Sequence, residues 1–321
     1  MGKNARPTRA LVTGGAGFIG HHLVRRLIAD GYEVCVLDNF ATGRRERLEG
    51  LDVDLVEGDL RSYERAHAAV RGAELVFHLG ALPSVPRSVQ DPLTTGAVNV
   101  EGTLNVLLAA RDEGVGRLVF ASSSSVYGAS PKLPKTEADQ ALPISPYGVS
   151  KLAAEHYCRA SATVYELETV SLRLFNVFGP GQDPLSQYAA VVPRFIAAFA
   201  SGDRPIVYGD GTQTRDFTYV DDVVEAFVIA ADTQSAARGL VLNVAAGRET
   251  PILHLIASLA EVFGRTVDPQ FEPARLGEVQ RSWGDATQAH RVLGWRPKWS
   301  LTNALRECIS PRAPGAELIS R

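Results

Sequence analysis

Two familiar kinds of cysteine and histidine pattern are missing from this sequence. Its three cysteines, Cys35, Cys158 and Cys308, are scattered and form no CxxC pair, which argues against a disulfide framework and against a structural zinc site. Its seven histidines show no HxxxH spacing. The adjacent pair His21 and His22 would point in different directions on a helix. The sequence therefore predicts no metal site.

Signals for membrane insertion, export and nucleic-acid binding are absent as well. No apolar run approaches the roughly 18–20 residues that span a bilayer. The basic residues near the start lead directly into an expected strand, without a hydrophobic region or a cleavage site. The formal net charge of −3 gives no electrostatic reason to bind nucleic acid or an anionic membrane. We therefore expect a cytoplasmic protein with neither partner.

What the chain does have is an ordinary globular composition and a regular alternation of elements. Its 321 residues are 45% hydrophobic and 21% charged, which suits one large domain or two smaller ones. Short apolar strands alternate with helices and predict an α/β fold, a doubly wound parallel sheet of the Rossmann type. The expected strands are 10–12, 33–38, 53–56, 75–79, 117–121 and 169–174, and the expected helices are 21–30, 62–71, 98–112 and 147–164.

The pattern changes after about Asn176. Glycine-rich loops at 179–181 and 209–211 interrupt it, and 191–201 and 220–231 are expected helices. We therefore assign residues 1–176 to the sheet domain. Residues 177–321 are mainly a smaller lobe, with some segments returning to the sheet.

The first motif with chemical meaning is the glycine turn. Gly14, Gly17 and Gly20 follow a strand and open a helix. Glycine allows the tight turn, the close approach of a phosphate and close packing of the helix on its strand. N–H groups at the helix start, here near Phe18 and Ile19, bind the anion. A glycine-rich turn alone is often only structural, but this context predicts a dinucleotide site.

Acidic residues at the next strand ends extend that site. Asp38 ends the second strand, about twenty residues after the glycines, where a carboxylate binds ribose hydroxyls and repels a 2′-phosphate. This favours NAD over NADP, although the nearby guanidinium groups of Arg44 and Arg45 could accept a 2′-phosphate. Asp59, followed by Leu60, closes the third strand at a position suited to the adenine amino group.

A second motif supplies groups for proton transfer. Tyr147 and Lys151 share one helix face at i and i+4, and an ammonium near a phenol is expected to lower the pKa of the tyrosine. The serine run 122–125 ends a strand, where ligands bind in open α/β sheets. A bare YxxxK could be a solvated helix face. After the glycine turn, however, it predicts an NAD(P)-dependent enzyme that oxidises an alcohol.

With these motifs the chain resembles the extended short-chain dehydrogenase/reductases, and among them the NAD-dependent nucleotide-sugar epimerase/dehydratase family. The matching segments run nearly end to end. They are TGGAGFIG (13–20), DN (38–39), GDL (58–60), HLGA (78–81), NVEGT (99–103), SSSSVYG (122–128), SPYGVSKLAAE (145–155), LRLFNVFGPGQ (172–182), YGDGTQTRDFTYVDDV (208–223), NVAAG (243–247) and LGW (293–295).

The resemblance implies a first chemical step. Tyr147 takes the proton from a sugar 4-hydroxyl while hydride passes from C4 to NAD, and Ser123 hydrogen-bonds the same oxygen. Lys151 also holds the nicotinamide ribose, and Ser124 is a further catalytic candidate. In epimerases of this kind NAD is regenerated and stays bound. The resemblance adds Asn39, Leu79, Ala81, Asn99 and Ala121 to the expected cofactor contacts.

The fate of the sugar after C4 oxidation is open between alternatives. Family 4,6-dehydratases carry an Asp-Glu pair where this chain has Ser124 and Ser125, and serine is a poor base. The leading expectation is therefore 4-epimerisation of a UDP-hexose or UDP-hexosamine. The alternative is a UDP-N-acetylglucosamine 5,6-dehydratase of the tunicamycin type, which would use the same Tyr147, Lys151 and NAD. An oxidoreductase that exchanges its cofactor ranks third. A non-catalytic NAD-binding scaffold is the alternative outside the enzymes. The intact tyrosine, lysine and serine run argue against it.

The resemblance also implies the nucleotide-sugar contacts and the assembly. Guanidinium groups suit bidentate phosphate contacts, and the loop 179–188 is a candidate lid over the sugar. A homodimer is expected through the helices at 98–112 and 147–164. The implied substrate contacts are Ser84 and Ser123 at the sugar, Asn176 and Val192 near the diphosphate and base, Tyr208 at the uracil, and Arg215 and Arg275 on the diphosphate.

Overall fold

The computed structural model describes residues 8–185, 190–233, 238–274 and 279–310. Its centre is a seven-stranded sheet in the order β11-β6-β5-β4-β1-β2-β3, and every neighbouring pair is parallel. The doubly wound α/β fold is thus confirmed. The strands are β1 (Arg9–Thr13), β2 (Glu33–Asp38), β3 (Val53–Glu57), β4 (Leu75–His78), β5 (Arg117–Ser123), β6 (Glu168–Leu174) and β11 (Arg238–Val244).

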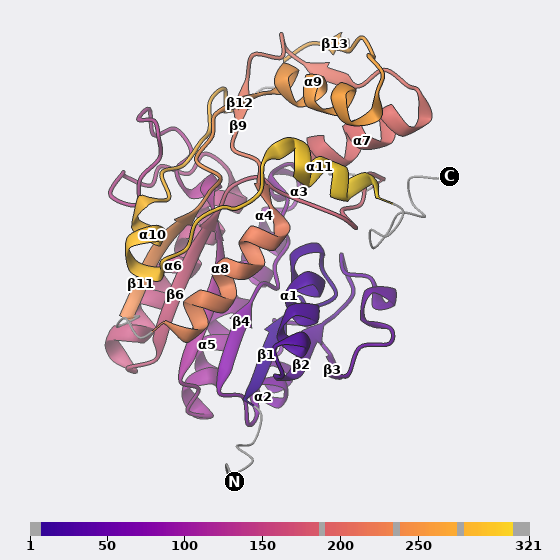
Figure 1. Ribbon diagram of the computed structural model, residues 1–321. Helices are drawn as coiled ribbons and strands as arrows, with labels where there is room; N and C mark the ends of the chain where they lie inside the picture. Colours follow the sequence, from indigo (N-terminus) through magenta and orange to yellow (C-terminus); the bar gives the residue numbers. More distant parts are fainter. Residues whose placement is uncertain (1–7, 186–189, 234–237, 275–278, 311–321) are drawn as a thin grey trace.

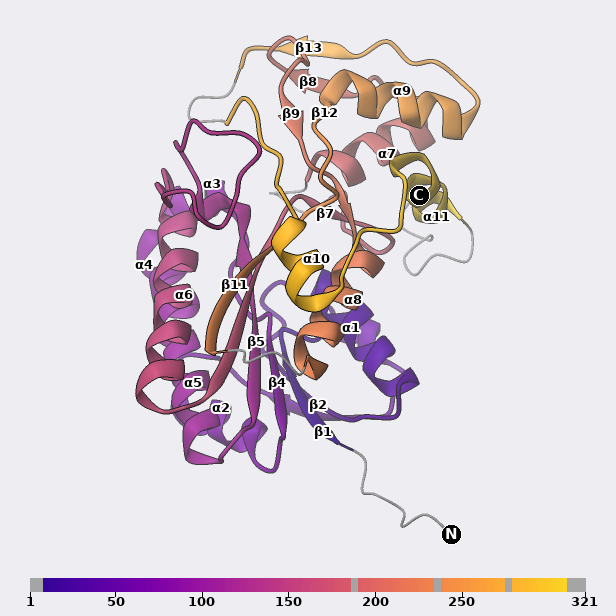
Figure 2. The same cartoon turned by 60° about the vertical axis from the view of Figure 1, so that its left-hand side comes forward.

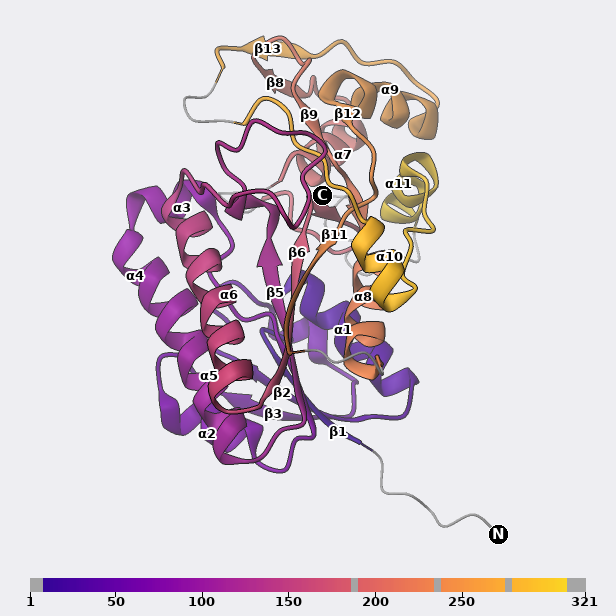
Figure 3. The same cartoon turned by 90° about the vertical axis from the view of Figure 1, so that its left-hand side faces the viewer.

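Helices cover both faces of this sheet (Figures 1 and 3). Successive strand residues point to opposite faces, so Leu11 joins one apolar core and Val12 the other. A strand that is buried on both faces therefore needs a continuous apolar run. One layer consists of α2 (Tyr63–Val70), α5 (Gly102–Asp112) and α6 (Pro146–Val164), and the other of α1 (Phe18–Ala29), α8 (Val220–Asp232) and α10 (Thr287–Leu293).

The helix expected over 98–112 is longer and less regular than predicted. Two short helices precede it, α3 (Val85–Gln90) and α4 (Pro92–Gly96), and a π-helical turn at Ala97–Glu101 leads into α5. Asp91 caps α4 by accepting a hydrogen bond from the Thr94 N–H at 3.0 Å. The Asp-Pro start signal at 91–92 was therefore in the sequence.

The second lobe lies beyond the carboxyl ends of the strands (Figure 2). Its helices α7, α9 and α11 pack on one another, while β11, α8 and α10 from the same half of the chain return to the sheet domain. The lobe comprises α7 (Val191–Ser201), α9 (Ile252–Phe263), α11 (Leu301–Ile309), the pair β8 (Ile206–Tyr208) and β13 (Gln270–Glu272), and the pair β9 (Thr214–Arg215) and β12 (Thr250–Pro251). Two further short strands pair in parallel, β7 (Val177–Phe178) soon after β6 and β10 (Thr218–Tyr219) directly before α8.

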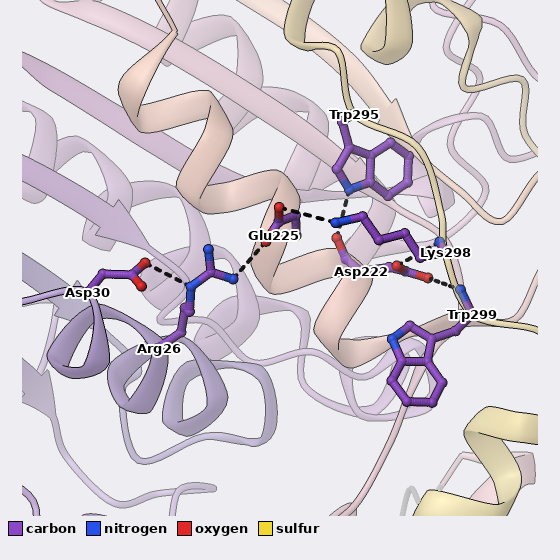
Figure 4. A network of polar contacts seen from close by, with 7 residues as sticks. All are labelled: Arg26, Asp30, Asp222, Glu225, Trp295, Lys298 and Trp299. Atoms are coloured by element: carbon purple, nitrogen blue, oxygen red, sulfur yellow. Dashed lines mark hydrogen bonds and ion pairs between the residues drawn. The ribbon is translucent and has the colours of Figure 1, made fainter.

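Asp222 on α8 fixes the segment that enters α11 (Figure 4). Its carboxylate accepts hydrogen bonds from the backbone N–H groups of Lys298 at 2.9 Å and Trp299 at 3.2 Å. The Asp222 carbonyl accepts a third from the Trp295 indole at 2.8 Å. Because these donors are mostly backbone groups, they hold the path of the chain rather than one side chain.

One turn further along α8, Glu225 links this segment to the first helix (Figure 4). It pairs with Arg26 of α1 at 2.7 Å and with Lys298 at 3.5 Å. Arg26 also pairs at 2.8 Å with Asp30, the residue that follows the last residue of α1. The network therefore links α1, α8 and the segment that precedes α11.

A buried histidine holds β1, β4 and the first turn of α5 together. His78 lies between two hydroxyl groups, with Nδ1 2.7 Å from Thr13 Oγ1 and Nε2 2.9 Å from Thr103 Oγ1. Thr103 donates its own proton to the Asn99 carbonyl at 2.6 Å, so it accepts from Nε2–H and leaves Nδ1 as the acceptor. This series of hydrogen bonds requires a neutral imidazole ring. Burial favours the same state, because it lowers the pKa of His78 to about 3.

We predict that His78 makes the stability fall as the pH is lowered. Its folded pKa of about 3 lies below the ordinary value of about 6.5, so the unfolded chain takes up the proton first and stability is lost from pH ~6.5 down towards 3. Between pH 7 and 5 this costs about 2 kcal/mol. His78→Gln keeps a donor and an acceptor but cannot titrate. Urea unfolding at both pH values should show a loss smaller by about that amount in the variant, and equal losses would contradict the assignment.

Candidate active site

A cavity of about 800 Å³ opens at the carboxyl ends of the sheet strands, where ligands bind in doubly wound folds. Residues that the sequence assigned to cofactor, catalysis and substrate come together on its walls. They are Gly14, Gly17, Phe18, Ile19, Asp38, Asn39, Asp59, Leu60, Leu79, Ala81, Ser84, Ala121, Ser123, Ser124, Tyr147, Lys151 and Asn176.

The glycine turn forms a cradle that side chains would fill. A Cβ on Gly14, whose φ is +69°, would lie 2.8 Å from the Gly80 Cα, and one on Gly20 would lie 2.1 Å from the Gly14 carbonyl oxygen. Helix α1 begins after Gly17 without a side-chain cap, so the N–H groups of its first turn are available to an anion. These features fit the pyrophosphate of a dinucleotide.

Asp38 serves the turn as well as the cavity. Its carboxylate accepts hydrogen bonds from the backbone N–H groups of Ala16 at 3.0 Å and Phe40 at 2.8 Å. Burial raises the pKa of Asp38, and these N–H donors oppose the rise. The remaining lone pairs of the carboxylate are available to ribose hydroxyls.

Arg44 and Arg45, the two arginines that could accept the 2′-phosphate of NADP, both bind carboxylates of the protein. Arg44 pairs with Asp183, and Arg45 pairs with Glu57. Both guanidinium groups thus already have anionic partners, which favours NAD.

At the adenine end the structure adds a residue that sequence reasoning missed. Arg61 binds the Asp59 carboxylate through Nε at 2.9 Å and Nη2 at 2.8 Å, and Asn39 donates to the same carboxylate at 3.0 Å. The Arg61 contact lowers the pKa of Asp59 to about 2. Asp59 is therefore ionised at neutral pH, and its close spacing to Arg61 was the available signal.

Tyr147, the tyrosine expected to be catalytic, lies at the start of a well-capped helix. Ser145 caps α6 by accepting from the Gly148 N–H at 3.1 Å, and Pro146 occupies the first turn. The Tyr147 N–H donates to Ser88 Oγ at 3.0 Å. The hydroxyl groups of Tyr147 and Ser123 are close enough for Ser123 to influence the pKa of Tyr147, and both residues line the cavity.

Lys151 is buried one turn further along the same face. Its Nζ donates to the Ala121 carbonyl at 2.9 Å and lies 4.8 Å from the centre of the Phe120 ring. Burial lowers the pKa of Lys151 to about 8.

The pKa of Tyr147 corrects one expectation. Burial raises it above the ordinary value, and the nearby Ser123 hydroxyl opposes that rise. The sequence argument expected Lys151 to lower this pKa. In the structure desolvation of the phenolate dominates, because the lysine is itself desolvated and its ammonium is bound to a backbone carbonyl.

Two of the predicted contacts lie beneath the surface instead of lining the cavity. Asn99 is buried, accepts from the Leu82 N–H at 2.8 Å and donates to Ser150 Oγ at 3.0 Å. It therefore braces the chain after β4 against α6. Val192 on α7 is only 3% exposed and belongs to the apolar core.

Two predicted substrate contacts occupy the second lobe outside the cavity walls. Tyr208 ends β8, and the Arg194 guanidinium lies 5.8 Å from the centre of its ring. Arg215 in β9 donates to the carbonyls of Thr214 and Val279, each at 2.8 Å. The sequence motifs correctly placed these two residues in the second lobe, but they did not reveal that the side chains lie outside the cavity walls. Arg275 lies outside the described residues.

A buried ion pair under the serine run was also missed. Arg173 binds Glu155 through Nε at 2.9 Å and Nη2 at 2.8 Å, and Ser122 donates to the same carboxylate. The Arg173 guanidinium also stacks over the Tyr127 ring at 4.8 Å. Glu155 lies on α6, four residues after Lys151. Because Arg173 belongs to β6 and Ser122 to β5, the contacts of Glu155 connect both strands to α6. A lone arginine in an apolar strand was the available signal.

Comparison with known proteins agrees with this geometry. Residues 10–245 match the NAD dependent epimerase/dehydratase family. A UDP-glucose 4-epimerase of Mycolicibacterium smegmatis is 41% identical over 94% of this chain and 97% of its own.

Solved structures extend the likeness to three dimensions. Thermus thermophilus UDP-glucose 4-epimerase in complex with NAD is 38% identical, with a TM-score of 0.86 over 94% of this chain and 98% of that one. UDP-N-acetylglucosamine 4-epimerase from Methanobrevibacter ruminantium, in complex with UDP-N-acetylmuramic acid, is 35% identical, with a TM-score of 0.90 over 95% and 98%.

The chain belongs to the NAD dependent epimerase/dehydratase family. It is an enzyme whose cofactor is NAD. In the described part of the chain, no helix has the length and apolarity to cross a membrane, and no group of three or more potential ligands among His, Cys, Asp and Glu could hold a metal ion.

We predict that Gly20→Ala damages the cofactor cradle. The added Cβ would meet the Gly14 carbonyl at 2.1 Å, so the turn must open, at a cost of about 1–3 kcal/mol in the free energy of unfolding. NAD should bind at least ~10-fold more weakly, measured by calorimetric titration of the NAD-free protein. Gly96→Ala is the matched control, because nothing lies within 4 Å of its Cβ position and its backbone is helical. Equal affinity in both variants would contradict the role of the turn.

Proposed function

We propose that this enzyme interconverts the C4 epimers of a UDP-hexose or UDP-hexosamine. The observation that carries the proposal is that Tyr147, Ser123 and buried Lys151 line the same cavity as the dinucleotide cradle. The named activities of the relatives, UDP-glucose and UDP-N-acetylglucosamine 4-epimerisation, support the same reaction.

The residues divide the work of the first half-reaction. Tyr147 acts as the phenolate that receives the proton of the sugar 4-hydroxyl, and Ser123 hydrogen-bonds the same oxygen as it becomes a carbonyl. Because burial raises the pKa of Tyr147, the phenol must be deprotonated before this step. Bound NAD supplies the hydride acceptor for C4. Lys151, held by the Ala121 carbonyl, places a positive charge one helical turn away, which offsets part of the cost of the phenolate. In the return step Tyr147 gives the proton back, so the enzyme ends as it began.

The distribution of carboxylates favours re-reduction over elimination. Among the described residues that line the cavity, the carboxylates are Asp38, Asp59 and Asp183. The first binds the glycine turn, the second Arg61 and the third Arg44. Beside Ser123 stand serines 124 and 125, and a serine hydroxyl is a poor base for removing a C5 proton. This distribution supports epimerisation over 5,6-elimination.

The test follows the sugar by proton NMR in deuterated water, without added NAD. We expect UDP-N-acetylglucosamine or UDP-glucose to yield its galacto isomer with no deuterium at C5. Vinyl signals with loss of the C6 hydroxymethyl would establish 5,6-elimination and overturn the proposal. Turnover of one sugar alone would identify the substrate.

The same assay tests the role of the tyrosine. Tyr147→Phe should lower kcat by roughly 10²–10⁴-fold, the usual contribution of a general acid–base group. Tyr32→Phe is the matched control, because the Tyr32 hydroxyl binds Asp232 at 3.2 Å on the other helical layer. Full activity of Tyr147→Phe would remove the phenol from the mechanism.

We further propose that the enzyme acts as a homodimer. Helices α3 and α4 adjoin α6 (Figure 3). Large apolar side chains are exposed on all three helices, among them Val149, Val89 and Leu93, which is 85% exposed. Within the described residues α5 exposes no such side chain, so α6 with α3 and α4 forms the candidate face. Light scattering should give twice 34.5 kDa, and Leu93→Asp combined with Val149→Asp should give the monomer. A monomeric wild type would refute the dimer.

A further inference from the structure

Residues 180–183 border the cofactor cavity and are attached to its glycine turn. Gln182 and Asp183 line the same cavity as the turn. The His22 ring of α1 donates from Nε2 to the Pro180 carbonyl at 3.0 Å. The sequence suggested this loop as a lid over the sugar, but its described contacts are with the cofactor half of the site.

Arg47 joins the loop to the glycine turn with one side chain. Its Nη1 donates to the Ala16 carbonyl at 3.1 Å, and its Nη2 donates to the Gly181 carbonyl at 2.7 Å. The guanidinium plane presents both donors in a fixed geometry. Any movement of the loop away from the turn must break at least one of these bonds.

Arg44 makes a second, independent connection between the same two segments. Its backbone N–H also donates to the Ala16 carbonyl, at 3.0 Å, and its side chain pairs with Asp183. The side chains of Arg44 and Asp183 are 39% and 24% exposed, so the pair is partly shielded from water. Asp183 keeps its own turn by accepting from the Leu185 N–H at 2.8 Å.

We propose that Arg44 and Arg47 form a clasp with residues 180–183 that keeps NAD in its cavity through successive turnovers. The need for retention rests on the proposed function, because only a reaction that returns the hydride can reuse one bound cofactor. The two arginines are positioning residues in this role. They act by holding the loop against the turn, and neither handles a proton of the reaction.

A simpler electrostatic role makes the opposite prediction for one variant. If the arginines merely attracted the pyrophosphate, removal of the Asp183 charge would strengthen NAD binding, because a carboxylate on the cavity wall repels phosphate. If they form a clasp, Asp183→Asn opens it and weakens retention. The asparagine keeps an oxygen for the Leu185 N–H, so the local turn is preserved.

The experiment measures NAD on the intact protein, without any sugar. NAD is released from the purified holoenzyme by denaturation and quantified, and its exchange is followed after addition of excess labelled NAD. We expect exchange to be ~10-fold faster in Arg47→Ala, which loses charge-assisted bonds to two carbonyls, and ~3-fold faster in Arg44→Ala and Asp183→Asn, which lose one partly exposed pair. The double variant Arg44→Ala/Asp183→Asn should exchange no faster than either single one.

Arg45→Ala is the matched control. The neighbouring arginine forms an exposed pair with Glu57, in which the side chains are 51% and 63% exposed, and it does not line the cavity. We expect its NAD content and exchange to equal those of the wild type. Thermal unfolding at saturating NAD shows whether each variant is folded.

Two results would overturn the clasp. They are unchanged exchange in folded Arg44→Ala and Arg47→Ala, and unchanged or slower exchange in folded Asp183→Asn. A protein that holds NAD by the clasp but epimerises no sugar would refute the proposed function alone, so the two failures are distinguishable.

Discussion

The backbone of Ala16 is the point from which the cofactor half of the site is held. Its N–H donates to Asp38 at the end of β2, and its carbonyl accepts from the Arg44 N–H and from the Arg47 side chain. One residue's backbone therefore fixes the glycine turn to the second strand, to the segment after it and, through Arg47, to residues 180–183. The cradle can be rigid although glycines build it, because its neighbours supply the constraint that glycine lacks.

The half of the site that contains Tyr147 and Lys151 is held in a different way, by buried polar groups. Lys151 is fixed by a carbonyl of β5, and Glu155 on the same helix is fixed by Arg173 of β6. Burial of such groups is costly unless they are paired, so each pair specifies how α6 lies on the sheet. Ser123 and Tyr147 come from two different elements, β5 and α6, so their meeting at the cavity depends on that placement.

The sequence was sufficient for features that depend on short spacings. The glycine turn, the strand-end acids and the i, i+4 pair Tyr147 and Lys151 are local patterns, and the structure brings them to one cavity. Contacts made across the fold could not be predicted in this way. Arg47 reaches Gly181, and Arg173 meets Glu155, only because distant segments pack together.

The differences between expectation and structure have the same origin. Asn99 belongs to a motif of the family, but its hydrogen bonds are to Leu82 and Ser150, a relation that spacing does not reveal. The direction of the Tyr147 pKa depends on the balance between desolvation and nearby charge, and burial is a property of the whole fold. Residue type gives the possible chemistry, while the surroundings decide which protonation state is favoured.

The position of β11 has a consequence for how the chain is made. This strand pairs with β6 at the edge of the sheet, yet residues 175–237 separate the two along the chain and supply α7 and α8 before β11 is reached. Until β11 is synthesised, the nearly fully buried strand β6 is therefore the edge of the sheet. An unpaired apolar edge invites association with other chains. The less buried strand β11 thus covers an edge that would otherwise be exposed.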